Sequence, residues 1–375
     1  MALPTLTPNK IFNALSNMII SQIVLADNIS NSHVSLADKS RVDGSMYGDS
    51  KVWYSSDVLR SYEWNGDAEA ANLLKLHRPE APEVQTITID QFRIIPVTVD
   101  NYLTKQAWST ENAFSSFNSQ MLSWMKETKR IFDATIFNTF VGTHSTDIGK
   151  QDMTISLPAE PDSADDYNIE AYNRLVAQII AQSMADLLID INDVSRSYND
   201  YGNLRSFEPN DMVFVWNSEW VNKIKKLDTP TIFHKDGLID KFAENVLPAR
   251  YFGNVNTSGG TTTGTNITVR SLIEKDYNTV EPNQAGYDPA KHIFAGDLLP
   301  GNTAYNANET YTEDKNIVFK AYHKDSIPFM TGFQSGTAFF NPRSLTETHY
   351  LIWGYNTLES LKNYPFITAK AQVAG

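Results

Sequence analysis

One long helical pattern, residues 109–142, constrains the architecture of this chain more than any other stretch. Its large apolar side chains recur at spacings of three and four, which is the repeat of an amphipathic helix. They are Phe114, Phe117, Met121, Trp124, Met125, Ile131, Phe132, Ile136 and Phe140. Ser109 or Thr110 can cap the start, and Gly142 suits the left-handed turn that ends many helices. Thirty-odd residues span on the order of 45 Å, so we expect other elements to lie along this helix.

Two candidate strands, 51–64 and 83–99, precede the helix and are separated by a polar segment. The second shows the alternation of a strand, with one side formed by Val84, Thr86, Thr88 and Asp90 and the other by Gln85, Ile87 and Ile89. Pro96 within it is best tolerated on an edge strand. We therefore expect residues 45–107 to form a long two-stranded excursion with an exposed edge. Two strands alone have only marginal stability, so we expect this excursion to pack on another surface.

The other patterns predict helices and strands that share one core. Residues 8–26 favour a short amphipathic helix, whereas residues 27–50 are polar and predict an extended arm, either disordered or laid on a partner. A second strong helix is expected at about 166–194, then a buried strand at 212–216 and a short helix that ends near Leu227. Further strands are predicted at 267–273, 291–296, 316–322, 326–331, 336–340, 347–355 and 364–371. This mixture is typical of an α+β fold.

Composition narrows the possible classes of function. The chain has 375 residues, 41% of them hydrophobic and 20% charged, which predicts a globular protein of two or three domains. Its net charge of −13 gives no overall positive charge that would attract the phosphates of a nucleic acid. The absence of cysteine excludes disulfides, Cys-based zinc sites and thiol nucleophiles. We find no run of 18 apolar residues and expect no membrane-spanning helix, and residues 10–26 are too polar at their centre for a good signal peptide.

No catalytic, metal or cofactor motif emerges from the sequence, and we assign none. Seven histidines lack metal-ligand spacing: His33, His77, His144, His234, His292, His323 and His349. Asp186, Asp190 and Asp193 share one face of the second helix and could bind a hard cation. A solvated polar stripe, with Asp193 one turn from Arg196, is the simpler interpretation. Because so large a chain carries so few candidate catalytic groups, we favour a structural role over catalysis.

The order and texture of four segments resemble the major capsid proteins of tailed bacteriophages, which have the HK-ninety-seven-type fold. The segments are EVQTITIDQFRIIPVTVDNYLTKQAW, TENAFSSFNSQMLSWMKETKRIFDATIFNTFVG, DMVFVWNSEWVNKIKKL and GTAFFNPRSLTETHYLIWGYNTLESLKNYPFITAKA. The resemblance covers essentially the whole chain and implies an N-arm (1–44), an E-loop (45–107), a P-domain with a long spine helix (108–159), an A-domain (160–335) and a return to the P-domain sheet (336–375).

The same resemblance implies a subunit that self-assembles as hexamers and pentamers into an icosahedral shell around packaged double-stranded DNA. The implied partners are other copies of the chain, scaffolding and portal proteins, and minor or decoration capsid proteins, with no membrane. The implied location is the virion, after assembly in the cytoplasm of the host bacterium. We expect assembly contacts from Trp53, Tyr54, Phe92, Ile94, Lys126, Lys129 and Arg130. Charge reversal at Lys129 is expected to spare the folded monomer and impair assembly.

Two alternatives stay open at this point. A compartment shell similar to the encapsulins would have the same fold and would enclose a cargo enzyme instead of a genome. A secreted carbohydrate-binding or hydrolytic α+β protein would belong to another class. It would be cleaved after Ala26 and would carry a pair of carboxylates in a cleft.

Overall fold

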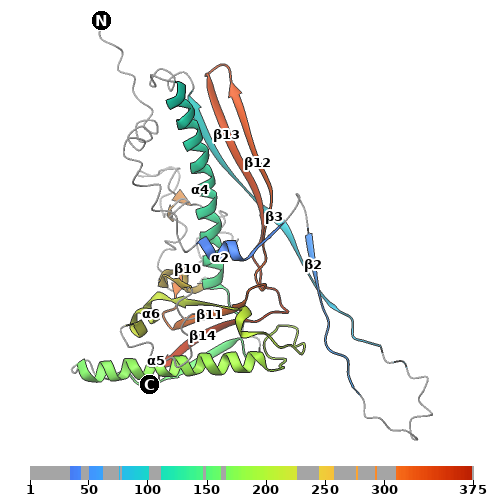
Figure 1. Ribbon diagram of the computed structural model, residues 1–375, viewed down its shortest axis with the longest axis vertical. Coiled ribbons are helices and arrows are strands. Elements are labelled where there is room, and N and C mark those ends of the chain that lie inside the picture. The colour runs from blue at the N-terminus through green and yellow to red at the C-terminus, as the bar shows by residue number, and fades with distance from the viewer. Residues whose placement is uncertain are drawn as a thin grey trace.

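The structure is a computed structural model in which two five-stranded mixed sheets combine with two long helices (Figure 1). It describes residues 34–43, 50–61, 76, 78–100, 111–146, 149–161, 166–225, 245–256, 276–277, 292–293 and 310–373. The helix predicted at 8–26 and the strand predicted at 267–273 lie outside these residues. Within the described part of the chain, the predicted α+β class is confirmed.

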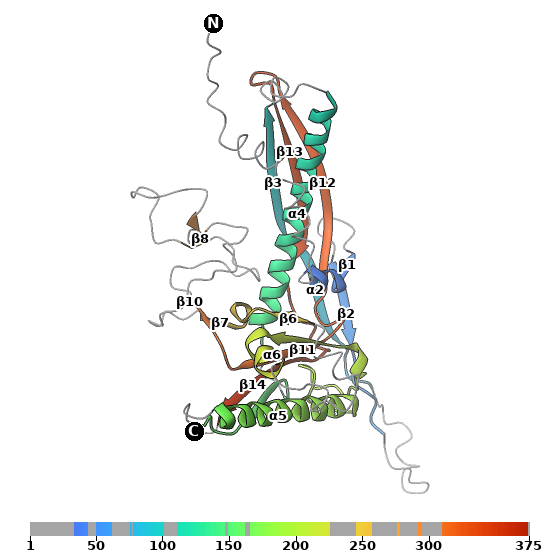
Figure 2. The same ribbon diagram turned by 60° about the vertical axis from the view of Figure 1, so that its left-hand side comes forward.

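The predicted long helix is present as α4 (Glu111–Thr143), and it lies along the first sheet. Figures 1 and 2 show it beside the three longest strands, β3, β12 and β13. The strands of this sheet, in spatial order, are β1 (Arg41–Asp43), β12 (Phe329–Asn341), β13 (Thr346–Asn356), β3 (Glu83–Asp100) and β2 (Ser50–Ser55). All neighbouring pairs are antiparallel except β1 and β12.

Aromatic packing explains why the helix lies on this sheet. The ring of Phe132 meets Trp353 edge-on at 5.8 Å and Tyr355 at 6.0 Å, and both partners belong to β13. The guanidinium of Arg93 on β3 lies 4.8 Å from the same ring. One turn and more further along, Phe137 and Val141 are fully buried. Each such side chain contributes roughly 1.5–3 kcal/mol when it leaves water, so the helix is fixed along its C-terminal half.

The second sheet is covered by α5 (Asp166–Asn192), which confirms the second predicted helix. Its strands, in order, are β4 (Asp152–Leu157), β14 (Phe366–Val373), β11 (Ile317–His323), β5 (Met212–Asn217) and β6 (Val246–Leu247). By length and composition, Ile169–Asn192 could also cross a membrane. However, Ile180, Met184 and Ile191 are fully buried in the core that contains Trp216 of β5, so we interpret α5 as a core helix.

Short elements complete the described chain. They are α2 (Val34–Lys39), η3 (Pro209–Asp211), α6 (Ser218–Lys225), η4 (Ala249–Tyr251), β7 (Gly253–Asn256), β8 (Asp276–Tyr277), β9 (His292–Ile293) and β10 (Thr310–Glu313). Asn217 caps the start of α6, because the backbone N–H of Glu219 donates to Asn217 Oδ1 at 3.1 Å.

Part of the predicted arm packs on its own chain, and this corrects the expectation of an arm without a core. Leu36 and Ala37 of α2 are buried in contact with α4, and β1 pairs in parallel with β12, with Arg41 opposite Phe329. The side chain of Arg41 also reaches Asp133 on α4. The polar composition of 27–50 concealed this, because few apolar side chains, Leu36, Ala37 and Val42 among them, make the contacts.

Three strand assignments also change. Residues 326–331 and 336–340 belong to the single strand β12, so the expected boundary at 335/336 falls inside a strand. The apparent break is a register shift between Gly332 and Ser335, as a β-bulge produces. The last strand, β14, lies in the second sheet instead of returning to the first. The first predicted strand ends early, at Ser55.

The two-stranded excursion is shorter than predicted, because β3 has two partners along its length. Residues 83–88 pair with β2, whereas residues 89–100 pair with β13 inside the first sheet. A strand of 18 residues extends about 60 Å, which is long enough to serve both. Among the described residues, the part that leads away from the body is therefore limited to β2, the first part of β3, and residues 56–61 and 78–82 beyond them (Figure 1).

His144 joins α4 to the second sheet. Its ring stacks on Phe140 at 4.8 Å and meets Phe366 of β14 edge-on at 4.7 Å. Its Nε2 lies 2.8 Å from Ser360 Oγ, and its carbonyl oxygen accepts a hydrogen bond from Lys320 Nζ at 2.8 Å. Burial, reinforced by the charge of Lys320, lowers the pKa of His144 to about 4. The ring is therefore neutral at pH 7 and acts as part of the core.

Lys129 is not a surface residue, which corrects its expected place among the assembly contacts. Only 9% of it is exposed, and its Nζ lies 2.8 Å from Oδ2 of Asp133, which is 1% exposed. The ammonium also lies 5.7 Å from the centre of the Trp353 ring. Lys126 and Arg130, by contrast, are exposed on the same helix. This burial gives a physical reason to expect the opposite of the sequence-based expectation, namely that charge reversal at Lys129 destabilises the monomer.

We predict that Lys129→Glu lowers the free energy of unfolding by about 3–5 kcal/mol, because it places a second carboxylate beside a buried one. Lys126→Glu makes the same change of charge on the exposed side of α4 and should stay within about 0.5 kcal/mol. Urea unfolding of the two variants and the parent protein measures the difference. Equal stability of the two variants would contradict the position assigned to Lys129.

Candidate assembly surfaces

The first sheet has one covered face and one open face. The face turned toward α4 carries Trp353 and Tyr355, both buried. The opposite face carries an outer-face patch of exposed apolar side chains, namely Phe92, Ile94 and Phe339, which are 40%, 52% and 63% exposed. The strand register puts them on one face, since Ile94 is opposite Ile352, Thr98 is opposite Thr348, and Thr348 is opposite Phe339. An apolar sheet face open to solvent favours contact with another protein surface.

The hairpin formed by β2 and β3 carries a second group of exposed apolar residues. Tyr54 is opposite Val84, and Val52 lies two residues away on the same face. All three are exposed, and Tyr54 is exposed by 72%. Trp53 points the other way and packs partly on the buried cluster that contains Leu361. Of the four apolar candidates predicted from the sequence, Tyr54, Phe92 and Ile94 are therefore exposed, and Trp53 belongs in part to the core.

Unpaired strand edges accompany these side chains. Among the described residues, β2 pairs only with residues 83–88 of β3, and residues 89–100 of β3 pair only with β13. Pro96 lies in this second stretch, where its missing N–H costs no ladder hydrogen bond if it faces the open side. An open edge presents backbone donors and acceptors to a neighbouring chain.

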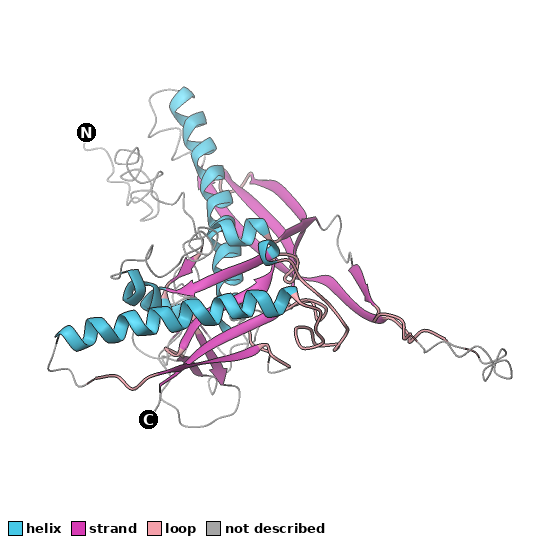
Figure 3. Ribbon diagram, turned by 60° about the horizontal axis from the view of Figure 1, so that its bottom comes forward, coloured by secondary structure: helices cyan, strands magenta, loops and turns pink. Residues whose placement is uncertain are grey.

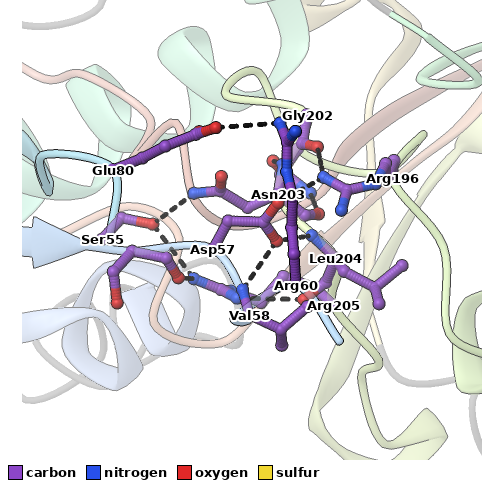
Figure 4. A network of polar contacts seen from close by, with 12 residues as sticks. Ser55, Asp57, Val58, Arg60, Glu80, Arg196, Gly202, Asn203, Leu204 and Arg205 are labelled. Carbon is purple, nitrogen blue, oxygen red and sulfur yellow. Dashed lines mark hydrogen bonds and ion pairs between the residues drawn. The ribbon is translucent and has the colours of Figure 1, made fainter. Parts of the chain in front are cut away.

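A network of polar contacts fixes the root of the hairpin to the body (Figure 4). The carboxylate of Asp57, just after β2, accepts hydrogen bonds from the backbone N–H of Leu204 at 2.9 Å and from Arg196 Nη1 at 2.6 Å. The Leu204 N–H, followed by Arg196, lowers the pKa of Asp57 to about 2. The sequence suggested that Arg196 lies near Asp193. In the structure, Arg196 pairs with Asp57 instead.

Arg205 makes a second connection to the same root. Its guanidinium donates to the carbonyl of Ser56 at 2.6 Å, to Ser55 Oγ at 3.2 Å and to Asn363 Oδ1 at 3.1 Å. Asn203 Nδ2 also donates to Ser55 Oγ, at 2.9 Å. Ser55 is itself buried. Together with Asp57, these contacts form a root clamp, which we define as Ser55, Asp57, Arg196, Asn203 and Arg205.

The other strand of the hairpin is held in the same way. Gln85 Nε2 donates to the carbonyl of Ser360 at 3.1 Å, and its Oε1 accepts from the N–H of Lys362 at 3.0 Å. Both strands are therefore tied to loops that border the second sheet. Further out, the pair of Arg60 and Glu80 joins the two arms at 3.1 Å in an exposed position. The direction in which the hairpin leaves the body is thus set by polar contacts at its root.

Asp186 and Asp190 of α5, and Asp193 just after it, line a groove of about 690 Å³ together with Lys150 and Tyr198. Lys150 Nζ lies 2.6 Å from Asp190 Oδ2, and this contact lowers the pKa of Asp190. Among the described residues, no group of three or more carboxylate, histidine or cysteine side chains is arranged to hold a metal ion. Asp190 therefore forms an ion pair with Lys150 on the surface of α5.

Comparisons with known proteins identify the fold. No protein-family model and no curated protein matches the sequence. Among solved structures, the chain is similar to one described as "Capsid structure of Staphylococcus phage Andhra", with 10% identity, 88% of this chain and 82% of that chain covered, and a TM-score of 0.58. The chain has a phage capsid fold.

A second structure supports the same assignment of fold. It is described as "Structure of head fiber and inner core protein gp22 of native bacteriophage P68", with 11% identity, 89% of this chain and 84% of that chain covered, and a TM-score of 0.58. Both likenesses extend over most of the chain. The fold expected from the sequence resemblance is confirmed at this level.

We predict that Asp57→Asn loosens the hairpin root while the core stays folded. The carboxylate has its ordinary pKa of 3.8 in the unfolded chain and about 2 in the fold. Its contribution is therefore present above pH 3.8 and lost as the pH falls toward 2. Amide hydrogen exchange at residues 55–61 should be about tenfold faster in the variant at pH 7, because the bonds to a charged group are lost.

Glu80→Gln is the matched control for this substitution, because it removes a carboxylate from the same hairpin. The Arg60–Glu80 pair is exposed at both ends, and such pairs contribute little. Exchange at the root should therefore be unchanged. If Glu80→Gln and Asp57→Asn have the same effect, the root clamp does not hold the hairpin.

Proposed function

We propose that this protein is a structural capsid subunit that assembles with copies of itself into the icosahedral shell of a tailed phage. One observation carries the proposal. The chain combines a phage capsid fold with a sheet that is covered by α4 on one face and open on the other, beside an anchored hairpin that leads away from the body. A protein that functions alone would gain nothing from leaving these surfaces exposed.

The exposed side chains supply an energetic reason to assemble. Tyr54, Ile94 and Phe339 are each more than half exposed, and full burial of a large apolar side chain contributes roughly 1.5–3 kcal/mol. A stable contact between proteins buries about 1,200–2,000 Å² in total. The outer-face patch and the hairpin would form the apolar centre of such a contact, while open strand edges would add hydrogen bonds.

We assign the elements to the expected parts of the capsid fold, with adjustments that follow from the packing. The hairpin of β2 and β3 corresponds to the E-loop, and α4 to the spine helix of the P-domain. The second sheet with α5 corresponds to the A-domain, and it includes β14 at the end of the chain. Residues 1–44 correspond to the N-arm, of which α2 and β1 pack on the P-domain of their own chain.

The surroundings of the subunit follow from the same proposal. Copies would form hexamers and pentamers, with scaffolding, portal and minor or decoration proteins as further partners. The shell would enclose double-stranded DNA without reading its sequence, and the net charge of −13 would limit adhesion to the phosphates. Lys126 and Arg130 are candidates for contact with a neighbour or with the interior of the shell. The location would be the virion, after assembly in the bacterial cytoplasm, and the role structural instead of enzymatic.

A phage shell is favoured over a cargo compartment, because both similar structures are described as parts of phage particles. The secreted alternative gains no support from the aspartates of α5, since Asp190 is engaged by Lys150.

Electron microscopy of the purified protein, with and without its scaffold, tests the proposed function. We expect closed shells or ring-shaped capsomers. Ile94→Asp places a charge in the outer-face patch and should give a folded protein that does not assemble, whereas Ile94→Val keeps the apolar surface and should assemble. A parent protein that stays monomeric under every assembly condition would rule the proposal out.

A further inference from the structure

The groove of about 690 Å³ lies between the start of β4 and the C-terminal part of α5, and we call it the strand–helix groove. Two contacts hold the helix along the strand. Tyr172 Oη donates to the carbonyl of Pro158, just after β4, at 3.2 Å. Lys150, just before β4, pairs with Asp190 near the end of α5. The helix therefore runs antiparallel to the strand, in front of the second sheet as seen in Figure 3.

The strand wall of the groove has an unpaired edge. Among the described residues, β4 pairs only with β14. The N–H of Thr368 on β14 donates to the carbonyl of Gln151, and backbone directions alternate along a strand. The backbone groups of Asp152, Thr154 and Ser156 therefore point to the open edge. Neither proline nor lysine, which often protect such edges, occurs in β4.

The helix wall presents negative charge around an exposed apolar side chain. Ile189 is 69% exposed. Asp186 and Asp193 lie three residues before it and four residues after it, on the same face. Asp152 from β4 adds a third carboxylate, whereas Lys150 is already paired. All three carboxylates are exposed, and none of them pairs with a cation in the described part of the chain.

The two walls together specify an extended basic segment. A strand added to β4 would place alternate side chains on the side of α5. Asp186 and Asp193 are separated by about 10.5 Å along the helix axis, and residues i and i+4 of a strand by about 13 Å. Lysines at these two positions reach both aspartates, because their flexible stems absorb the difference. Residue i+2 then lies over Ile189, so the expected pattern is basic–x–apolar–x–basic.

The charges favour a different protein over a second copy of this chain as the occupant. Each described strand of the chain carries at most one lysine or arginine, so none has this pattern. Pairing of β4 with β4 of another copy would bring like charges together, which opposes association. A metal ion is also disfavoured, because the described residues contain no cluster of three or more ligands arranged to hold one.

We propose that the strand–helix groove binds an extended basic segment of a second protein, which adds a strand to the open edge of β4. The main chain of the segment supplies hydrogen bonds to β4, and its alternate side chains supply specificity on α5. This binding activity belongs to the single subunit and lies beyond its proposed assembly with copies of itself. The groove shares no residue with the outer-face patch or the hairpin.

A labelled peptide with the expected pattern, TKTVTKT, tests the proposal on the intact subunit. Fluorescence anisotropy at low salt measures its dissociation constant, and circular dichroism confirms that each variant is folded. Asp186→Asn with Asp193→Asn should raise the dissociation constant at least about tenfold, because two charged contacts are lost. Glu208→Gln with Glu359→Gln is the matched control, since it removes two exposed carboxylates outside the groove. The control should change the dissociation constant by less than about twofold, because salt screens distant charges.

Thr154→Pro tests the strand edge separately from the charges. The N–H of Thr154 points away from β14, so proline removes a donor of the open edge and no bond of the sheet. We expect the dissociation constant to rise about tenfold, as the loss of edge hydrogen bonds predicts. A peptide N-methylated at alternate residues should lose binding to the parent protein to the same extent, and this measurement needs no variant to fold.

Three results would overturn the proposal. The first is a parent protein that does not bind the peptide. The second is equal binding of the N-methylated peptide, which would mean that charge alone acts. The third is an equal effect of the groove variant and the matched control. Each result is independent of whether the subunit forms shells, so failure of the proposed function would be a separate finding.

Discussion

The packing of α4 on the first sheet is the contact on which the rest of the structure depends. Phe132 lies against Trp353 and Tyr355, with the guanidinium of Arg93 close to the same ring. This contact uses one face of the sheet and leaves the other face open. It also determines which charged residues of the helix are buried, because the rotation that places Phe132 on the sheet turns Lys129 inward toward Asp133. The open face of the first sheet follows from this buried interface.

A second constraint determines where those surfaces point. One face of the hairpin packs on the apolar cluster of Ile87 and Leu361. Its root is also held by hydrogen bonds that join residues 56–57 and Gln85 to the loops around the second sheet. Bonds of this kind fix direction, because a charged donor and acceptor require definite geometry. His144 fixes the other end of the same body by joining α4 to β14. These contacts hold the exposed apolar surfaces in set directions, which agrees with the proposed role as a shell subunit.

Much of the fold could be predicted from local pattern, whereas most of the candidate site could not. The helices α4 and α5 and the strand β5 were predicted because their apolar residues repeat with the period of their own structure. The root clamp joins Asp57 to Arg196, residues 139 apart in sequence, so no local pattern reveals it. The sequence predicts an exposed Lys129, whereas the structure buries it. Helical spacing shows which residues share a face of the helix, but it does not show how the helix is rotated on the sheet. The sequence pattern predicts two strands where the structure has β12 alone. The register shift lies between Gly332 and Ser335, and glycine and serine are residue types that also favour turns.

Amide hydrogen exchange, compared between the free subunit and the assembled particle, tests the central claim most directly. The claim is that neighbours cover the hairpin and the open face of the first sheet, while the buried face is complete in the single chain. Exchange at residues 50–55 and 91–98 should be at least tenfold slower in the particle, because partner contacts remove the openings that permit exchange. The buried half of α4, residues 131–142, should exchange equally in both states. Protection confined to α4, with the hairpin unchanged, would contradict the account.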